Sequence, residues 1–264
     1  MFLGLRQVCI AVSDINAAVT TLSALFDVEC SIRDDPHVSR HGLRNAVLPF
    51  GSAFIELLTP FRDGTPVGRH LERVGGDAGY MLILDTDDFG FWEHHLLIAQ
   101  ATVVREGRDG TYCFRQIHPK SVGGVLLSID ADGIPNDGRW HPAGSNWRAH
   151  VRNGRVNGLS GVKLESAAPF NLAARWSKVL DRQLQDLPGA DPVLALDAAT
   201  IRFAEGQPGS FQCMTGVKVH GDHVQKCIEA AAALGLQRGQ GWVRALGMTF
   251  ELEATEPKRL EVKR

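Results

Sequence analysis

The chain has 264 residues, of which 44% are hydrophobic and 22% are charged, a balance that excludes a disordered, collagen-like or membrane-bundle protein. Its 28 Lys and Arg residues are matched by 30 Asp and Glu residues, and the formal net charge of −2 excludes a strong field for nucleic acid or an anionic membrane. No apolar run reaches the ~20 residues that span a bilayer, and the N-terminus carries no readable export signal. We therefore expect a cytoplasmic protein with no nucleic-acid or membrane partner.

Length and cysteine content predict the internal organisation. One hydrophobic core gives way to two near ~250–300 residues, so we expect two domains with separate cores. The cysteines are odd in number and form no C-x-x-C pair, which indicates buried, reduced thiols rather than disulfides or a zinc cage. They are Cys9, Cys30, Cys113, Cys213 and Cys227.

The first quarter of the chain reads as a strand, a helix and a hairpin. A strand is predicted over Val8–Val12, and Ser13 and Asp14 then supply an N-cap for an amphipathic helix over Ile15–Phe26. The hairpin strands that follow are predicted over Leu43–Phe50 and Ala53–Leu58.

The same order of elements recurs three times, so the sequence predicts four copies of one unit. In the second unit, the strand is predicted over Tyr80–Leu84, the helix over Phe89 to about Gln100, and the strand pair over Thr111–His118 and Val125–Ile129. In the third, the strand is predicted over Gly161–Leu164, the helix over Phe170–Leu180, and the strand pair over Val193–Leu196 and Thr200–Ala204. In the fourth, the strand is predicted over Gly216–Val219, the helix over Asp222–Leu234, and the strand pair over Trp242–Leu246 and Met248–Glu253.

A segment without helical or strand periodicity separates the second and third units. Residues 131–156 are rich in Gly, Pro, Asn and Arg and carry Trp140 and Trp147. Such composition is typical of a linker. Because each indole can remove a large apolar area from water, we expect this linker to lie against a domain surface.

Three segments carry a resemblance to a known family. Leu5–Asp14 is similar to an opening strand, Ala53–Pro60 to a strand that bears an acidic ligand, and His118–Ser128 to a closing hairpin of the vicinal oxygen chelate superfamily, which includes glyoxalase I, methylmalonyl-CoA epimerase, extradiol dioxygenases and bleomycin-resistance proteins. The resemblance implies an α+β fold in which four βαβββ modules pair into two curved-sheet domains. It implies a first domain over residues 1–130 with the active cleft, a linker over 131–156, and a degenerate, structural second domain over 157–264.

The resemblance also implies where a divalent cation would be held. Metal-dependent members place ligands at positions that carry Gln7, Glu56, Tyr80 and Ser128 in the first domain, and Ser160, Arg202, Met214 and Glu251 in the second. In the first domain only Gln7 and Glu56 match, whereas a catalytic metal normally needs three protein ligands. We therefore expect no bound metal, with a weak divalent cation on Gln7 and Glu56 left open.

Without a metal, Glu56 becomes the candidate general base, because a carboxylate in a cleft loses hydration and its pKa rises. Tyr80 could donate to a substrate oxyanion, although a core Tyr with a satisfied hydroxyl is the competing interpretation. His118 could shuttle protons and Lys120 could meet an anionic group such as that of a CoA thioester, although both residues could equally be solvated turn residues. Gln7 and Ser128 complete the expected substrate contacts.

Two functional hypotheses remain open. In the first, the protein is a lyase or isomerase that moves a proton next to the carbonyl of a small oxygenated metabolite. In the second, it binds or sequesters a small molecule without chemistry, as the bleomycin-resistance resemblance implies. A homodimer is compatible with either. Serine-hydrolase, P-loop and Rossmann motifs are absent, and extradiol cleavage lacks its two-His, one-carboxylate triad.

Overall fold

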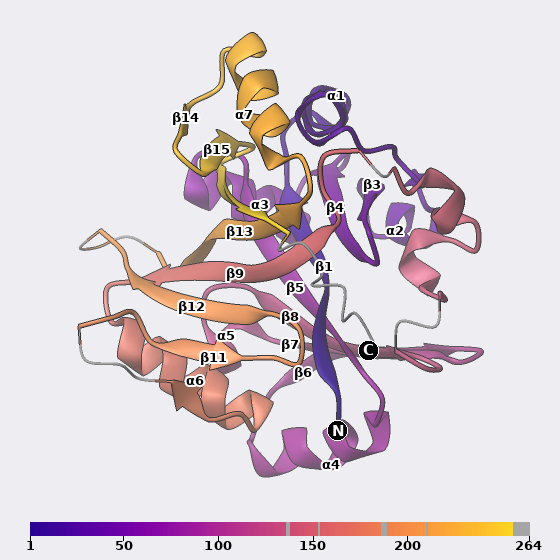
Figure 1. Ribbon diagram of the computed structural model, residues 1–264. Helices are drawn as coiled ribbons and strands as arrows, with labels where there is room; N and C mark the ends of the chain where they lie inside the picture. The colour runs from indigo at the N-terminus through magenta and orange to yellow at the C-terminus, as the bar shows by residue number, and fades with distance from the viewer. Residues whose placement is uncertain (136–137, 153, 186–188, 208, 210, 256–264) are drawn as a thin grey trace, which may run out of the picture.

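The computed structural model describes residues 1–135, 138–152, 154–185, 189–207, 209 and 211–255, and it contains two eight-stranded sheets (Figure 1). The expected linker includes residues 136, 137 and 153, and the expected second domain ends with residues 256–264; these lie outside the described residues. No described helix is long and apolar enough to cross a bilayer.

The first sheet has the strand order β2-β3-β4-β1-β5-β8-β7-β6. Its central strands β1 and β5 are antiparallel to each other, while β1 pairs in parallel with β4 and β5 pairs in parallel with β8. The strands are β1 (Leu3–Ala11), β2 (Ile32–Arg33), β3 (Leu43–Phe50), β4 (Ala53–Pro60), β5 (Ala78–Thr86), β6 (Val103–Asp109), β7 (Tyr112–Ile117) and β8 (Leu126–Asp132). The helices between them are α1 (Ile15–Phe26), α2 (Pro36–Ser39), α3 (Pro66–Val74), α4 (Phe89–Ile98) and α5 (Pro119–Val122).

The second sheet repeats this topology in the order β10-β11-β12-β9-β13-β16-β15-β14. Its strands are β9 (Gly158–Ser166), β10 (Leu184–Gln185), β11 (Val193–Ala195), β12 (Thr200–Glu205), β13 (Cys213–Gly221), β14 (Arg238–Gly239), β15 (Trp242–Ala245) and β16 (Met248–Ala254), with helices α6 (Pro169–Leu180) and α7 (Val224–Ala233). Two short 3-10 helices, η1 (His141–Ala143) and η2 (Trp147–His150), lie between the sheets in sequence. The predicted α+β fold of four βαβββ modules is confirmed.

Local signals explain the elements that were predicted well. Asp14 caps α1 by accepting hydrogen bonds from the backbone N–H groups of Asn16 and Ala17 at 2.9 and 3.0 Å. Asp88 caps α4 by accepting from Phe91 N at 2.9 Å. Both helices begin where the sequence places a short acidic side chain before an apolar run.

Several short or exposed elements have no such signal. Strand β6 forms an edge of the first sheet and most of its residues are exposed, so its sequence shows no alternation. Helix α3 has a Thr65 cap and Pro66 in its first turn but buries only Val67 and His70. Strands β2, β10 and β14 contain two residues each. These elements depend on pairing and packing that a single sequence does not reveal.

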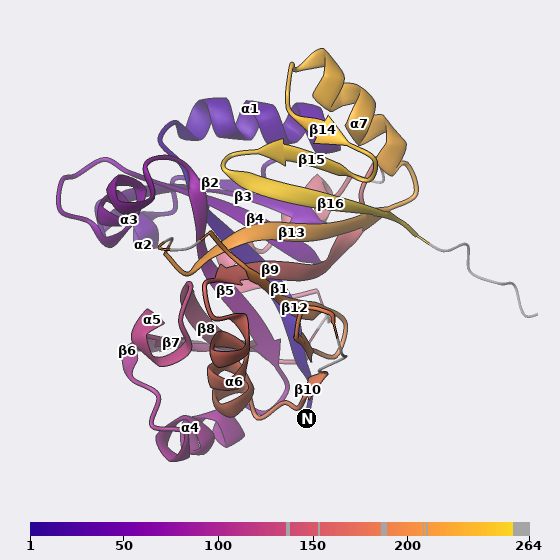
Figure 2. The same cartoon turned by 90° about the vertical axis from the view of Figure 1, so that its left-hand side faces the viewer.

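The structure has two clusters of buried residues, but they are not divided between the two halves of the chain as we expected. One continuous cluster of buried residues runs from Leu3 to Leu252 and combines the helix-covered faces of both sheets. Figure 2 shows the sheets stacked, with α1 and α7 side by side. The sheets touch closely at Gly79, where a Cβ would lie only 2.7 Å from the carbonyl oxygen of Met214. The two halves of the chain therefore share their main apolar burial.

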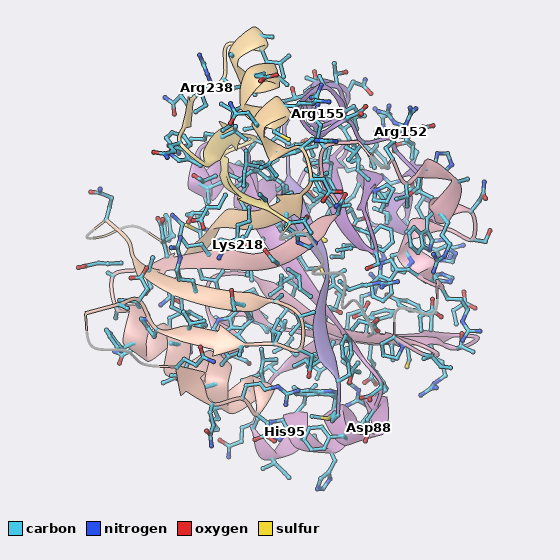
Figure 3. All side chains as sticks on the ribbon, in the orientation of Figure 1. Asp88, His95, Arg152, Arg155, Lys218 and Arg238 are labelled. Atoms are coloured by element: carbon cyan, nitrogen blue, oxygen red, sulfur yellow. The ribbon has the colours of Figure 1, made fainter. Side chains whose placement is uncertain are left out.

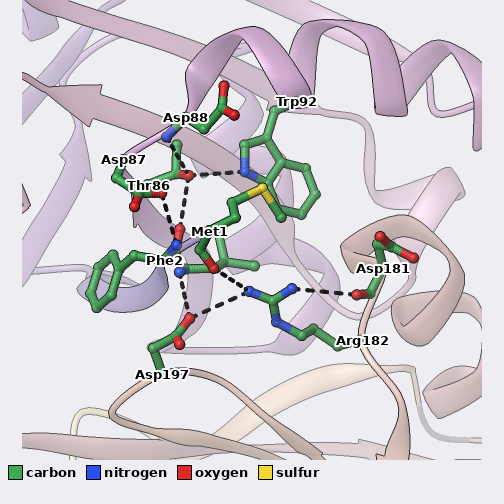
Figure 4. Close-up of polar contacts among 10 residues, drawn as sticks. Met1, Phe2, Thr86, Asp87, Asp88, Trp92, Asp181, Arg182 and Asp197 are labelled. Carbon is green, nitrogen blue, oxygen red and sulfur yellow. Dashed lines mark hydrogen bonds and ion pairs between the residues drawn. The ribbon is translucent and has the colours of Figure 1, made fainter.

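Polar contacts join the chain start to the second half (Figure 4). The backbone N–H of Leu3 donates to Asp197 Oδ2 at 2.6 Å, and Asp197 N donates to Leu3 O at 3.0 Å. Arg182 Nη2 donates to Met1 O at 3.2 Å and to Asp197 Oδ2 at 3.3 Å. Strand β1 is thus anchored at its start by a turn and a helix end of the second half.

The shared core predicts cooperative unfolding. Phe26 is fully buried, with its ring 5.3 Å from that of Phe50 and 5.0 Å from that of Phe250. We expect Phe26→Ala to lower the free energy of unfolding by about 3–5 kcal/mol, because it leaves a cavity between the halves. Denaturant titrations followed by circular dichroism and tryptophan fluorescence should give one coincident transition. Leu97→Ala, at a 72% exposed side chain, should change stability by less than about 0.5 kcal/mol. Two separated transitions would contradict the shared core.

Candidate functional site

The strand registers identify four equivalent positions, one per module. Glu56 pairs with Cys9, Ser128 with Ile83, Arg202 with Lys163 and Glu251 with Lys218. The positions equivalent to Gln7 are likewise Met81, Gly161 and Gly216. We expected Tyr80, Ser160 and Met214 there; each lies one or two places away. The β1–β5 and β9–β13 ladders contain register shifts that the sequence does not show.

In the first sheet, Glu56 is buried and its carboxylate is fully hydrogen-bonded. Asn45 Nδ2 donates to Oε1 at 2.8 Å, and Gln7 Nε2 donates to Oε2 at 2.8 Å. The Cys9 thiol donates to the same Oε2 at 3.2 Å. Burial raises the pKa of Glu56, and the three donors oppose that rise because they favour the carboxylate. The network brings Gln7 and Glu56 together, but it pairs them with each other and not with a cation or a substrate.

Residues of the predicted linker cover this network. Trp140 is 2% exposed, and its indole N–H donates to Gln7 Oε1 at 2.8 Å. Its ring stacks on Phe54, with centroids 6.4 Å apart, while Trp147 packs edge-on against Phe54 at 5.0 Å. The guanidinium of Arg6 lies over both Phe54 and Trp140. We call this surface of the first sheet, packed by Trp140, Ala143 and Trp147, the covered face.

A second polar network on the covered face surrounds Asp130. Tyr112 donates to Asp130 Oδ2 at 2.6 Å, and Ser128 Oγ donates to Oδ1. Burial raises the pKa of Asp130 to about 7, helped by the nearby carboxylates of Asp85 and Glu56. The Ser128 hydroxyl, expected to contact substrate, is therefore engaged with Asp130.

Tyr80 also lies against the covered face. Its ring packs edge-on against His70 with centroids 5.3 Å apart, and burial raises the pKa of Tyr80 to about 12. His70 Nε2 lies 3.0 Å from the carbonyl oxygen of Gly79. Tyr80 is thus a neutral, partly buried phenol that lies near Cys9.

His118 and Lys120 lie elsewhere in the structure. His118 caps α5, and its Nδ1 accepts from Lys120 N at 2.9 Å. The carbonyl oxygen of Lys120 accepts from Arg175 of α6, and Val122 of α5 belongs to the shared core. The described contacts connect this turn to the helix-covered side, and none connects it to Glu56.

The residues present do not fit a divalent cation in either sheet. Gln7 Oε1 accepts from Trp140, both oxygens of Glu56 accept from amides, and Met81 offers only a thioether. In the second sheet Gly161 and Gly216 have no side-chain donor, and Arg202 brings a positive charge. Within the described ranges, no group of three or more His, Cys, Asp or Glu residues is placed to hold a metal. Metal ligation would require the existing hydrogen bonds to be broken.

The second sheet presents a cavity of about 500 Å³ on the side opposite the shared core. We call this surface the open face. Its lining is polar and carries both charges: Arg202, Lys218, Gln237, Gln240, Gly241, Trp242, Arg244, Thr249, Glu251, Leu252 and Glu253. We expected the working cleft in residues 1–130 and a structural second domain, whereas this cavity, larger than the one of about 320 Å³ beside Gly51 and Trp147, lies in the second half.

Ion pairs cross the open face. Arg202 Nη2 donates to Glu251 Oε1, and Lys218 Nζ lies 3.0 Å from Glu253 Oε1. Lys218 extends from β13 in Figure 3. Arg244 has no carboxylate partner among the residues that the structure describes. The open face thus carries two basic side chains that are paired with carboxylates, Arg202 and Lys218, and a further guanidinium, that of Arg244.

Several site residues were not anticipated from the sequence. Asn45 is an ordinary polar residue within a strand, and only its 1% exposure identifies it as a partner of Glu56. Trp242 and Arg244 lie on a four-residue strand, where alternation places them on one face, and that alternation was the available signal. Gly239 permits the Trp242 indole to lie over β14, since a Cβ there would be 2.3 Å from Nε1.

The comparisons with known proteins concern the fold. A mutant of 4-hydroxymandelate synthase from Streptomyces coelicolor aligns with a TM-score of 0.71 at 15% identity, over 95% of this chain and 92% of that chain. A hypothetical protein from Staphylococcus aureus aligns with a TM-score of 0.66 at 11% identity, over 97% and 100%. Methylmalonyl-CoA epimerase from Mycobacterium tuberculosis aligns at 24% identity over 50% of this chain and 89% of its own, with a TM-score of 0.43.

No family model and no curated protein matches the sequence. The chain shares the fold of these solved structures, with two sheets of paired modules, which is the architecture that the resemblance implied. At these identities the likeness extends to the fold and not to the activity.

The covered face predicts that a free indole can replace the Trp140 side chain. Trp140→Ala should lower the free energy of unfolding by about 3–5 kcal/mol and leave an indole-sized space beside Gln7 Oε1. Indole should then raise the melting temperature of the variant but not that of the wild type. Indene, which lacks the N–H group, should stabilise the variant less. Equal stabilisation of both proteins by indole would contradict the packing of Trp140.

Asp130 predicts a stability change with pH. The folded-state pKa of about 7 exceeds the unfolded value of about 3.9, so the protonated acid favours the folded state. This contribution is present below about pH 4 and is lost as the pH rises to about 7. The free energy of unfolding of the wild type, relative to Asp130→Asn, should therefore fall over that range, by at most about 4 kcal/mol. Urea titrations at several pH values measure the difference, and a rise with pH would contradict the assignment.

Proposed function

We propose that the protein binds a small, polar, oxygenated molecule on the open face of the second sheet. The observation that carries the proposal is the cavity of about 500 Å³ lined by charged and amide side chains and one indole. A cavity of this size suits a metabolite-sized ligand, and convergent polar groups give orientation and specificity. A smaller cavity of about 320 Å³ lies beside the first sheet, lined by Gly51, Ser52, Trp147, Arg148 and Val151, and it does not include Glu56 or Gln7.

The side chains around the cavity divide into an aromatic and a charged part. Trp242 of β15 supplies a flat apolar surface, and Thr249, Gln237 and Gln240 supply neutral hydrogen-bonding groups. Arg244 provides a guanidinium without a carboxylate partner among the described residues. This combination favours a compact organic molecule that carries oxygen acceptors, and it supports binding without chemistry as the primary role.

A second candidate function is proton transfer by Glu56, of the lyase or isomerase type. The raised pKa of Glu56 favours it, since a general base works best when its pKa approaches the working pH. Tyr80, a neutral phenol on the same face, would donate a hydrogen bond to an oxyanion in this scheme. This candidate requires Trp140 to leave Gln7 so that substrate can reach the carboxylate.

Thermal stabilisation by small oxygenated metabolites distinguishes the two candidates. Compounds that raise the melting temperature of the wild type should lose that effect in Trp242→Ala and keep it in Glu56→Gln, with or without EDTA. The reason is that Trp242 lines the cavity, whereas Glu56 lies under the covered face. A ligand that keeps its effect in Trp242→Ala, together with turnover that disappears in Glu56→Gln, would instead establish the second candidate.

A further inference from the structure

Arg202 occupies the position on the open face that Glu56 occupies on the covered face. Its guanidinium reaches Glu251, which lies on β16, three strands away across β9 and β13. Adjacent strands are spaced by about 4.8 Å, so a flat sheet would separate these positions by roughly 14 Å. The two long side chains therefore extend toward each other over β9 and β13, and the contact holds a positive charge at the cavity.

Most of the Arg202 donors are not used by the protein. A guanidinium has about five N–H donors in one plane. Nη2 donates to Glu251, and Nε forms a longer ion pair with Asp191 Oδ2 at 4.0 Å, which is beyond hydrogen-bond range. No other acceptor among the described residues bonds to this side chain, which is 39% exposed and lines the cavity. Glu251 thus fixes one edge of the guanidinium and leaves the remaining donors to a ligand.

The geometry points to a small organic carboxylate as the ligand of the open face, anchored on Arg202 without a metal ion; this inference rests on the proposed function. A planar guanidinium pairs with a carboxylate through parallel hydrogen bonds, which a lysine ammonium cannot reproduce. Glu251 and Glu253 are already paired with Arg202 and Lys218, which reduces their repulsion of an incoming anion. Arg244 adds a second guanidinium on the same cavity.

The misfit for a cation supports the same conclusion. The positions equivalent to Gln7 carry Gly161 and Gly216, so Glu251 is the only anionic side chain among the four equivalent positions of this sheet. The Arg202 guanidinium takes the place of a ligand and repels a cation. It supplies the positive charge itself, and we therefore expect carboxylate binding to be indifferent to chelators.

The test uses matched acids and amides on the full chain. Lactate, malate and benzoate are titrated by calorimetry into EDTA-treated protein, beside lactamide, malamide and benzamide, with and without added Mg²⁺ or Ni²⁺. The proteins are the wild type, Arg202→Gln, Arg202→Lys and the control Arg238→Gln. Arg238 lies on β14 outside the cavity lining, well apart from Lys218 in Figure 3. Thermal unfolding of each variant verifies that it is folded.

We expect at least one acid to bind the wild type at least about tenfold more tightly than its amide, which corresponds to about 1.4 kcal/mol. Arg202→Gln should weaken that binding by tenfold or more, Arg202→Lys should restore only part of it, and Arg238→Gln should leave it unchanged. The inference is overturned, while the proposed function stands, if an acid or amide binds at Trp242 with the same affinity in Arg202→Gln as in the wild type. Binding that requires added metal has the same consequence. If no probe binds the open face, both are overturned.

Discussion

The structure depends on one buried carboxylate being satisfied by protein groups. Glu56 lies inside the first sheet, and an unpaired buried carboxylate would be strongly destabilising. Asn45, Gln7 and Cys9 supply its hydrogen bonds, and Gln7 in turn accepts from Trp140. Because the Gln7 side chain donates to Glu56 and accepts from Trp140, it connects the segment that carries Trp140 to the same hydrogen-bond network. The covered face is closed because Trp140 and Trp147 pack over Phe54 beside this network.

The two sheets therefore share one topology but differ in the side chains at equivalent positions and in whether that face is covered. Equivalent strand positions carry Glu56 and Ser128 in the first sheet and Arg202 and Glu251 in the second. In the first sheet the two acidic networks require donors from the protein, and two tryptophans exclude water from them. In the second sheet opposite charges pair across the strands and remain half-exposed, which leaves room for a ligand above them. Duplication preserved the fold while the chemistry of the faces diverged.

The repeated pattern made the fold predictable, whereas the site depended on features that a single sequence hides. Asp14 followed by an apolar periodic segment predicted α1 with its observed bounds, and the fourfold recurrence predicted the modules. The family resemblance implied that Gln7 and Glu56 lie at neighbouring ligand positions, but not that they would hydrogen-bond to each other. The two tryptophans of residues 131–156 indicated that this segment lies against a domain surface, but not that Trp140 would donate to Gln7. The partner Asn45 and the bulges that shift Tyr80 by one place had no signal in the sequence, because they depend on contacts between residues distant in sequence.

The indole N–H signals of the five tryptophans offer the most direct test of the central claim that the covered face is closed and the open face binds. A two-dimensional nitrogen–proton spectrum recorded during titration with a bound metabolite should show the Trp242 signal moving. The Trp140 and Trp147 signals should stay in place and exchange slowly with deuterium, because both residues are almost fully buried. Movement of the Trp140 and Trp147 signals, with Trp242 unchanged, would contradict the account and place the ligand beside Glu56.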